Sequence, residues 1–383
     1  MSRKVRHVMG ISGGKDSAAL AIYIKNKYPH LNIEYYFCDT GKELKETYQL
    51  INNLEIYLGE RIVHLKAIEG DHETPFDHFY KFFDGYLPSS NARWCTRMLK
   101  LIPFEKFVGD DPVVSYVGIR GDEDREGYIS RKPNIQSIFP FRRNIWSEDV
   151  INKVLKNENI PTIASLYLPE RIRSQSGDSQ TDEKIEDNGK LNKILKFVNK
   201  PVSVGFTQEQ KLCALLDFGV VTFNKMVFEF LKNSDYPLAF TSNFPLVENE
   251  DVLVRDDIFR ILEESGVGVP GYYQKIEFSL NGEKGEYARS RSGCFFCFFQ
   301  QKIEWVWLYE QHNELFKRAM EYEKEGFTWT KDERLEDLIK PKRIQQIKKE
   351  HLKKTTSNHN KKSPYLIDIL VEAEGEGCAA CFV

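Results

Sequence analysis

The stretch Ser12-Gly13-Gly14-Lys15-Asp16-Ser17 decides the expected fold, because it lies between an apolar run at 5–11 and an apolar helical pattern at 17–27. Glycines let a backbone approach a phosphate closely, and the first turn of a helix offers free N–H groups and a positive dipole end. Lys15 adds a positive charge, and Ser12 and Ser17 add hydroxyl groups. The spacing is too short for the mononucleotide loop G-x-x-x-x-G-K-[ST]. The sequence therefore predicts a strand, a phosphate-binding loop and a helix.

Two further apolar runs end in polar residues. The run at 33–38 leads into Asp39-Thr40-Gly41, and the run at 113–119 leads into Arg120-Gly121-Asp122-Glu123. Strands that alternate with helices form parallel βαβ units, and ligands bind at the carboxyl ends of such strands. We therefore expect an α/β fold with a doubly wound, mostly parallel sheet, a helical insertion and a helical C-terminal region.

The composition is that of a globular chain with a reduced-thiol chemistry. The 383 residues include 54 Lys and Arg, 57 Asp and Glu, and seven cysteines, for a net charge of −3. Seven cysteines are too few for a disulfide scaffold, and their odd number fits thiols, metal ligation or catalysis better. The chain has no signal-peptide pattern and no apolar run of the ~18 residues that a membrane span needs. We expect a soluble, cytoplasmic protein with no membrane partner.

Changes of composition along the chain predict four regions. Residues 1–168 carry the nucleotide-binding α/β pattern, and 169–250 combine a polar linker at 173–189 with a helical insertion. Residues 251–330 are expected to form a helical region that completes the site and contains Cys294-Phe295-Phe296-Cys297 among many aromatics. Residues 331–383 combine a basic helix with a tail that holds Cys378 and Cys381.

Four segments, in the same order, resemble the phosphoadenosine-phosphosulfate (PAPS) reductase family of the PP-loop ATP-pyrophosphatase superfamily. SGGKDS at 12–17 resembles the PP-loop, and Asp39-Thr40-Gly41 opens a segment similar to D-T-G-x-E-x-x-E-T. Residues 93–103 resemble R-x-C-T-x-x-L-K-x-x-P, and 118–123 resemble G-I-R-x-D-E. The superfamily cleaves ATP between its α- and β-phosphates and transfers AMP to an acceptor.

The resemblance implies roles for individual residues, with ATP and Mg²⁺ as cofactors. The implied catalytic residues are Lys15, Asp16, Cys95 and Arg120. The implied nucleotide-binding residues are Ser12, Gly13, Gly14, Lys15, Asp16, Ser17, Asp39, Thr40, Gly41, Arg97, Lys100, Gly118, Arg120, Asp122 and Glu123.

The C-x-x-C pair in its aromatic surroundings suits thiolate ligands to a metal. Cys95, Cys294 and Cys297 resemble the ligands of the cluster-bearing members of the family, so we expect an iron–sulfur cluster of the 4Fe-4S type. Structural zinc is the alternative, and an unmetallated redox pair is another. A fourth cysteine upstream of Cys294 is missing; Cys213, the tail pair or no protein ligand at all are the choices. Cys38 and Cys213 have apolar neighbours, which favours packed thiols.

An intact SGGKDS and the lack of an E-C-G-L-H segment favour ATP use over sulfonucleotide reduction. The nearest type is the DndC-like sulfurtransferase of DNA phosphorothioation. We expect adenylation of a nucleic acid, DNA being favoured over tRNA, followed by insertion of sulfur that a separate cysteine desulfurase supplies. A PAPS or adenylylsulfate reductase is one alternative. A nucleotide-sensing subunit of a phage-defence complex, with other defence proteins as partners and a structural zinc site, is the other.

Between Lys340 and Lys362 the chain has nine Lys or Arg and one Glu, a local excess of eight positive charges. Such a run can follow a nucleic-acid backbone or form a solvated helix. The two interpretations stay open at the level of sequence.

Overall fold

The N-terminal order of strand, glycine loop and helix is confirmed by the computed structural model. It describes residues 4–68, 72–123, 130, 132–167, 184–331 and 333–359. Strand β1 (Arg6–Gly10) leads through the loop to helix α1 (Lys15–Lys27), and β2 (Ile33–Cys38) leads to α2 (Lys45–Leu58). Small and apolar residues from Ala18 to Ile24 are almost fully buried in α1, which is why that helix carries so little polar surface.

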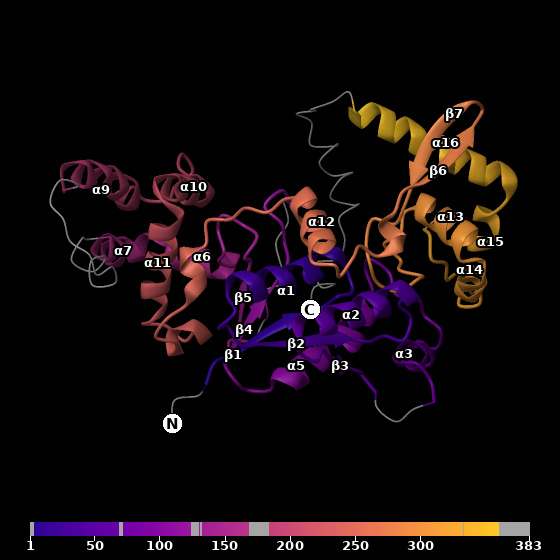
Figure 1. Cartoon of the computed structure of the whole chain (residues 1–383), viewed down its shortest axis with the longest axis horizontal. Coiled ribbons are helices and arrows are strands. Elements are labelled where there is room, and N and C mark those ends of the chain that lie inside the picture. Colours follow the sequence, from indigo (N-terminus) through magenta and orange to yellow (C-terminus); the bar gives the residue numbers. More distant parts are fainter. Residues whose placement is uncertain are drawn as a thin grey trace. The chain divides into compact units, whose positions relative to one another are not determined.

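The predicted α/β fold with a parallel sheet is confirmed (Figure 1). The remaining strands are β3 (Val63–Leu65), β4 (Val113–Tyr116) and β5 (Ile135–Ile138), and the sheet has the order β3-β2-β1-β4-β5. The pairs β2–β3, β1–β4 and β4–β5 are parallel, and the register of the central pair sets Val8 opposite Ser115. Because the chain order reverses beside β1, the loop after β1 follows a strand at the switch point, where such sheets bind ligands.

The chain divides into two compact units. Unit 1 comprises Met1–Met9, Ile24–Glu34 and Asp110–Asp257, and unit 2 comprises Gly10–Tyr23, Tyr35–Gly109 and Ile258–Val383. In unit 1 the sheet strands are followed by helices and short 3₁₀ turns: α6 (Glu148–Val154), η2 (Asn157–Asn159), α7 (Ile160–Leu166), α9 (Lys184–Asn199), α10 (Gln208–Phe218), α11 (Val220–Leu231), η3 (Pro237–Phe240), η4 (Pro245–Glu248) and the start of α12 (Arg255–Glu264). A buried hydrogen bond of 2.9 Å from Trp146 Nε1 to Asn224 Oδ1 ties α11 to the segment before α6.

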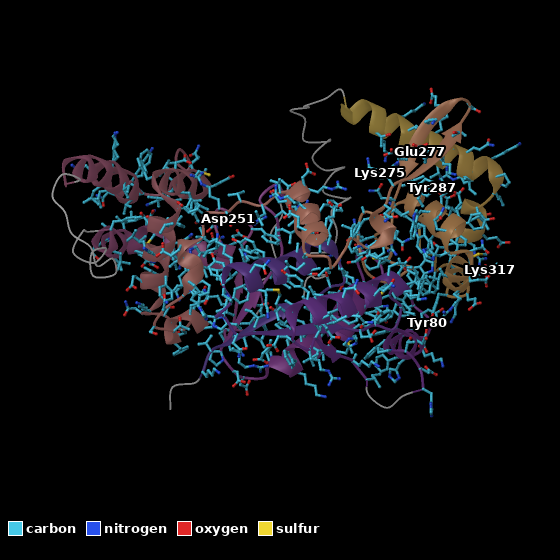
Figure 2. The ribbon with its side chains drawn as sticks, viewed as in Figure 1. Tyr80, Asp251, Lys275, Glu277, Tyr287 and Lys317 are labelled. Carbon is cyan, nitrogen blue, oxygen red and sulfur yellow. The ribbon has the colours of Figure 1, made fainter. Side chains whose placement is uncertain are left out.

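Unit 2 joins the nucleotide-loop segment to the C-terminal third of the chain. Its further elements are α3 (Pro75–Phe82), α4 (Trp94–Thr96), η1 (Arg97–Leu101), α5 (Ile102–Val108), η5 (Gly271–Tyr273), β6 (Ile276–Leu280), β7 (Glu283–Tyr287), α13 (Lys302–Gln311), α14 (Asn313–Met320), α15 (Leu335–Leu338) and α16 (Pro341–His359). One apolar core includes Phe76, Trp94, Phe296, Trp305 and Leu335, so residues more than 250 positions apart share it. The Tyr80 hydroxyl donates to the Tyr322 carbonyl at 2.8 Å and so joins α3 to the segment after α14. Figure 2 labels Tyr80 on α3.

Three details differ from the sequence-based expectations. Residues 276–287 form an antiparallel β6–β7 hairpin, with Glu277 and Tyr287 on its strands, where a helical region was expected (Figure 2). Helix α9 already begins at Lys184, inside the expected linker at 173–189. Cys213 is exposed, so the expectation that it is a packed thiol is wrong; Cys38 is buried as expected.

Of the described helices, none combines the length and the apolar character that crossing a membrane requires. The four predicted regions of the chain stay a prediction.

Candidate functional site

The loop between β1 and α1 is held in shape by its own serines. The Ser12 amide donates to Ser17 Oγ at 3.1 Å, and Ser17 Oγ donates to the Gly14 carbonyl at 3.1 Å. Gly13 has φ +73°, and a Cβ there would lie 2.3 Å from Thr47 Cγ2. A left-handed residue with no room for a side chain must be glycine, which is the physical reason for the first glycine of the motif.

Lys15 and Asp16 form a buried pair at the first turn of α1. Lys15 Nζ lies 3.0 Å from Asp16 Oδ2, and each side chain is 9% exposed. Lys15 Nζ also lies 5.1 Å from the centre of the Tyr273 ring. A cation, a carboxylate and the positive end of a helix dipole are therefore gathered at one loop, an arrangement that suits phosphate chemistry with Mg²⁺.

Residues from the C-terminal part of unit 2 close this loop, and the sequence patterns did not single them out as site residues. The Tyr272 hydroxyl donates to the Gly13 carbonyl at 2.7 Å, and the Lys15 amide donates to the Tyr273 hydroxyl at 3.4 Å. Ser292 Oγ donates to the Ser12 carbonyl at 3.4 Å. The one available signal was the polar run at 289–292 immediately before the cysteine pair.

Gly14 shows how close that approach is. A Cβ on Gly14 would lie 2.7 Å from Ser292 Oγ, so the second glycine makes room for a residue 278 positions later in the chain. Gly13 thus permits the left-handed backbone of the loop, and Gly14 permits the close contact with the segment around Ser292.

The Asp39-Thr40-Gly41 turn is an acceptor-rich corner at the end of β2. Asp39 Oδ1 accepts hydrogen bonds from the Gly41 amide and the Tyr48 hydroxyl, both at 2.9 Å. Desolvation works to raise the pKa of Asp39, but hydrogen bonds from His64, Gly41 and Tyr48 lower it below its ordinary value. Asp39 is therefore held as a carboxylate, the form that binds a hydroxyl group or a cation.

The next residues connect this turn to the cysteine pair. The Phe295 amide donates to the Lys42 carbonyl at 2.9 Å, and Glu43 forms an antiparallel bridge with Cys294. Thr40 Oγ1 lies 3.2 Å from Cys294 Sγ and donates to Glu43 Oε1 at 2.6 Å. The structure thus brings the Asp39-Thr40-Gly41 segment and the cysteine pair together.

The cysteines lie at the apolar core of unit 2. Cys95 and Cys294 both pack against it, and the Cys297 amide donates to the Cys294 carbonyl at 3.2 Å in a tight turn. Desolvation first, and then the charge of Glu43, raise the pKa of the Cys294 thiol, while the positive charge of Lys100 opposes the rise. Lys100 is half-buried within reach of this thiol, whereas Arg97 is exposed.

A metal centre needs several donor side chains close together. Within the described part of the chain, no three His, Cys, Asp or Glu side chains gather closely enough to hold a metal ion. Cys378 and Cys381 lie outside the described residues. The iron–sulfur cluster and the zinc alternative stay predictions, and we derive no chemical step through either.

The fourth sequence segment, residues 118–123, belongs to unit 1 and forms an ion-pair group of its own. Arg120 Nε lies 2.9 Å from Asp122 Oδ1, and Arg120 Nη1 lies 2.7 Å from Glu123 Oε1. The Gly121 amide donates to the Leu253 carbonyl at 2.9 Å, and Gly118 is buried. These contacts fix the segment within unit 1, and the roles that the resemblance gives to Gly118, Arg120, Asp122 and Glu123 stay predictions.

Comparison with known proteins agrees with the order of these segments. Residues 6–168 match the model of the phosphoadenosine phosphosulfate reductase domain. A curated relative, an uncharacterized protein of Methanocaldococcus jannaschii, is 31% identical over 154 residues, which are 36% of this chain and 30% of that protein. The match thus spans about a third of the relative's length.

A solved structure, the phosphate complex of phosphoadenylyl-sulfate (PAPS) reductase from Candida auris, is 18% identical. It covers 37% of this chain and 66% of that chain with a TM-score of 0.28. Residues 6–168 are therefore similar to the phosphoadenosine phosphosulfate reductase domain.

Proposed function

We propose that the chain is an AMP-forming PP-loop enzyme that activates a nucleic-acid acceptor with ATP for the insertion of sulfur. The match of residues 6–168 to the PAPS reductase domain supports an enzyme that acts on a nucleotide. The observation that carries the finer proposal is the complete loop Ser12–Ser17 at the start of α1, which keeps its lysine and its serines and to which Tyr272 and Tyr273 form hydrogen bonds.

In the proposed reaction an acceptor oxygen attacks the α-phosphorus of ATP. The bond from that phosphorus to the bridging oxygen breaks, and pyrophosphate leaves with the electron pair. The loop N–H groups and Lys15 stabilise the negative charge of the leaving group, as preorganised donors do in phosphoryl transfer. Mg²⁺, when bound, would neutralise phosphate charge, and Asp16 and Asp39 are the carboxylates that the site offers it.

In the second step a sulfur nucleophile attacks the activated acceptor atom, and AMP leaves with the acceptor's former oxygen. We propose a persulfide from a cysteine desulfurase as the sulfur donor, with a second thiol cleaving the remaining S–S bond and becoming oxidised to a disulfide. The basic sequence of α16 favours a polynucleotide acceptor over a metabolite, and we propose DNA as the favoured acceptor and tRNA as the second.

The decisive experiment supplies α-labelled ATP with and without duplex DNA or tRNA and separates the nucleotide products. We expect labelled AMP and pyrophosphate from the wild type and a loss of at least 100-fold in Lys15→Ala. Lys45→Ala is the matched control, since Lys45 is an exposed lysine at the start of α2. ADP as the labelled product would contradict the proposal.

A second candidate is a sulfonucleotide reductase, which the domain match favours by its description. It would release sulfite from PAPS in the presence of a dithiol and leave ATP intact. Sulfite release without AMP formation from ATP would therefore decide for the reductase. Binding of nucleotide with turnover of neither substrate would decide for a nucleotide-sensing subunit.

A further inference from the structure

Arg289 is a buried cation with unused hydrogen-bond donors. Its side chain belongs to a residue that is 2% exposed. Nη2 donates to the Cys294 carbonyl at 3.2 Å, but Nε and Nη1 have no acceptor among the residues that the structure describes. Over the same residues Arg289 makes no salt bridge, and its guanidinium carbon lies 5.9 Å from the centre of the Trp307 ring.

Such an arrangement is costly unless another group completes it. A buried charge without a counter-charge and a buried donor without an acceptor both destabilise a folded chain. The neighbouring Glu304 does not serve Arg289, because Oε1 accepts from the Ser290 amide at 2.6 Å and from Ser290 Oγ at 2.7 Å. The guanidinium is thus matched to an anion that is not one of the described side chains.

The position of Arg289 says where that anion binds. The Arg289 amide donates to the Tyr272 carbonyl at 2.9 Å, and the Tyr272 hydroxyl in turn donates to the Gly13 carbonyl. Burial raises the pKa of both Tyr272 and Tyr273, and the positive charge of Arg289 opposes that rise in each. The guanidinium therefore lies within electrostatic reach of the two phenols that touch the loop.

The start of α1 supplies the second half of the same site. α1 has 13 residues, and its first turn presents the positive end of the helix dipole beside Gly13 and Gly14. Ser292, three residues after Arg289, reaches the Ser12 carbonyl. The segment that carries Arg289 therefore contacts the loop at the start of α1, and the charge of Arg289 acts on the two tyrosines that bond to that loop.

We propose that Arg289 binds the phosphate groups that leave as pyrophosphate, together with the start of α1. This inference rests on the proposed function and deepens it by giving one residue to the leaving group. Nε and Nη1 lie on different edges of the guanidinium, so each can donate to a separate oxygen of an anion, and the positive charge strengthens both hydrogen bonds. The sulfate end of PAPS shares this chemistry, and the choice of probes separates the two sources.

The test measures the binding of inorganic pyrophosphate, ATP, AMP and PAPS to the full chain by calorimetry, in the wild type and in Arg289→Gln. We expect Arg289→Gln to weaken pyrophosphate and ATP about 10- to 100-fold, the effect of losing charge-assisted hydrogen bonds. AMP, which lacks the leaving phosphates, should change by less than about twofold. Arg61→Gln, at an exposed arginine of the same unit, is the matched control and should change none of the affinities.

Arg289→Lys keeps the positive charge and provides a second test in case the neutral variant Arg289→Gln does not fold. It should bind pyrophosphate about tenfold more weakly than the wild type, because lysine supplies the charge without the fork. Equal losses for AMP and pyrophosphate, or no loss for either, would overturn the assignment of Arg289. A loss confined to PAPS would overturn it in favour of a sulfate site.

The two proposals fail in different ways. Pyrophosphate binding that depends on Arg289, in a chain that forms no AMP from ATP, would keep the anion site and remove the proposed reaction. AMP formation and pyrophosphate affinity that are both indifferent to Arg289 would keep the reaction and remove the anion site.

Discussion

At the scale of single residues, Gly13 shows why a loop motif has a fixed composition. Its φ of +73° and the 2.3 Å between a built Cβ and Thr47 Cγ2 are two separate obstacles to any side chain. Gly59 at the end of α2 has φ +65°, and no described atom lies within 4 Å of its built Cβ. A side chain at Gly59 would meet backbone strain alone, whereas one at Gly13 would meet both strain and steric overlap.

We expect Gly13→Ala to lower the free energy of unfolding by about 2–4 kcal/mol, since strain and overpacking each cost about 1–3 kcal/mol. Gly59→Ala should cost about 1 kcal/mol, from strain alone. Urea unfolding measures both, and ATP binding should weaken in Gly13→Ala only. Equal costs for the two variants would show that Thr47 yields to the added methyl group.

Residue patterns predicted the parts of the site that are local in sequence. The serines and glycines of 12–17 interact with one another, and Asp39 accepts from Gly41 two residues later, so short motifs contain the whole interaction. Tyr272, Tyr273 and Ser292 could not be found in this way. Their contacts depend on a fold that brings the C-terminal part of unit 2 to the loop.

At the scale of elements, one carboxylate joins two helices of unit 2. Glu333 accepts from Arg343 of α16, with Nε at 2.8 Å and Nη2 at 2.6 Å, and Lys302 of α13 also donates to it. The Glu333 side chain is 13% exposed. The Arg343 hydrogen bond is the largest cause that lowers the pKa of Glu333 from 4.5 to about 2.

A lowered folded-state pKa of an acid stabilises the fold above the unfolded-state value and ceases to do so as the pH falls through the folded-state value. We expect Glu333→Gln to cost on the order of 1–3 kcal/mol at pH 7, the worth of hydrogen bonds to charged groups. The difference from the wild type should shrink between pH 4.5 and about 2. Denaturant unfolding of the wild type and of Glu333→Gln across this pH range measures the difference in their free energies of unfolding.

The control for that experiment is Glu314→Gln. Glu314 pairs with Lys317 on α14, and the Glu314 side chain is 84% exposed. Exposed pairs add little to stability, so this variant should behave as the wild type at every pH. A pH-independent cost for Glu333→Gln would show that Glu333 acts through packing and not through its charge.

Elements with clear periodicity were predictable, and short or polar ones were not. Apolar runs predicted β1, β2 and β4, although β4 ends at Tyr116 and not at residue 119. The strands β6 and β7 have the sequences IEFSL and EKGEY with mostly exposed side chains, so burial gives them no strong signal. Their pairing across a two-residue turn, and not their apolar content, makes them strands.

At the scale of the whole molecule, a net charge of −3 conceals a basic helix. Lys342, Lys349 and Lys353 of α16 are exposed, and their spacing of seven and four residues puts them on one stripe of the helix. Such a stripe matches the charge of a nucleic-acid backbone. Binding of a polynucleotide should then depend on these lysines and on salt.

We expect duplex DNA to bind with an affinity that falls as salt rises, and the double variant Lys349→Gln with Lys353→Gln should reduce the salt slope by about 2 units. Fluorescence anisotropy of a labelled duplex across salt concentrations measures the slope. The matched control is Lys275→Gln with Lys284→Gln at the β6–β7 hairpin, where the lysines pair with Glu286 and Glu277 (Figure 2). Identical slopes for both double variants would exclude α16 as the contact surface.

The hydrogen bond from Tyr272 to the Gly13 carbonyl spans 259 positions of sequence, so it cannot form until long after the loop has been synthesised. A ribosome that adds roughly 5–20 residues per second needs on the order of 10–50 s to proceed from the loop to Tyr272. During that interval the nascent loop lacks the phenol that closes it. A nascent chain should therefore acquire its affinity for nucleotide late, when the segment up to Ser292 has left the ribosome.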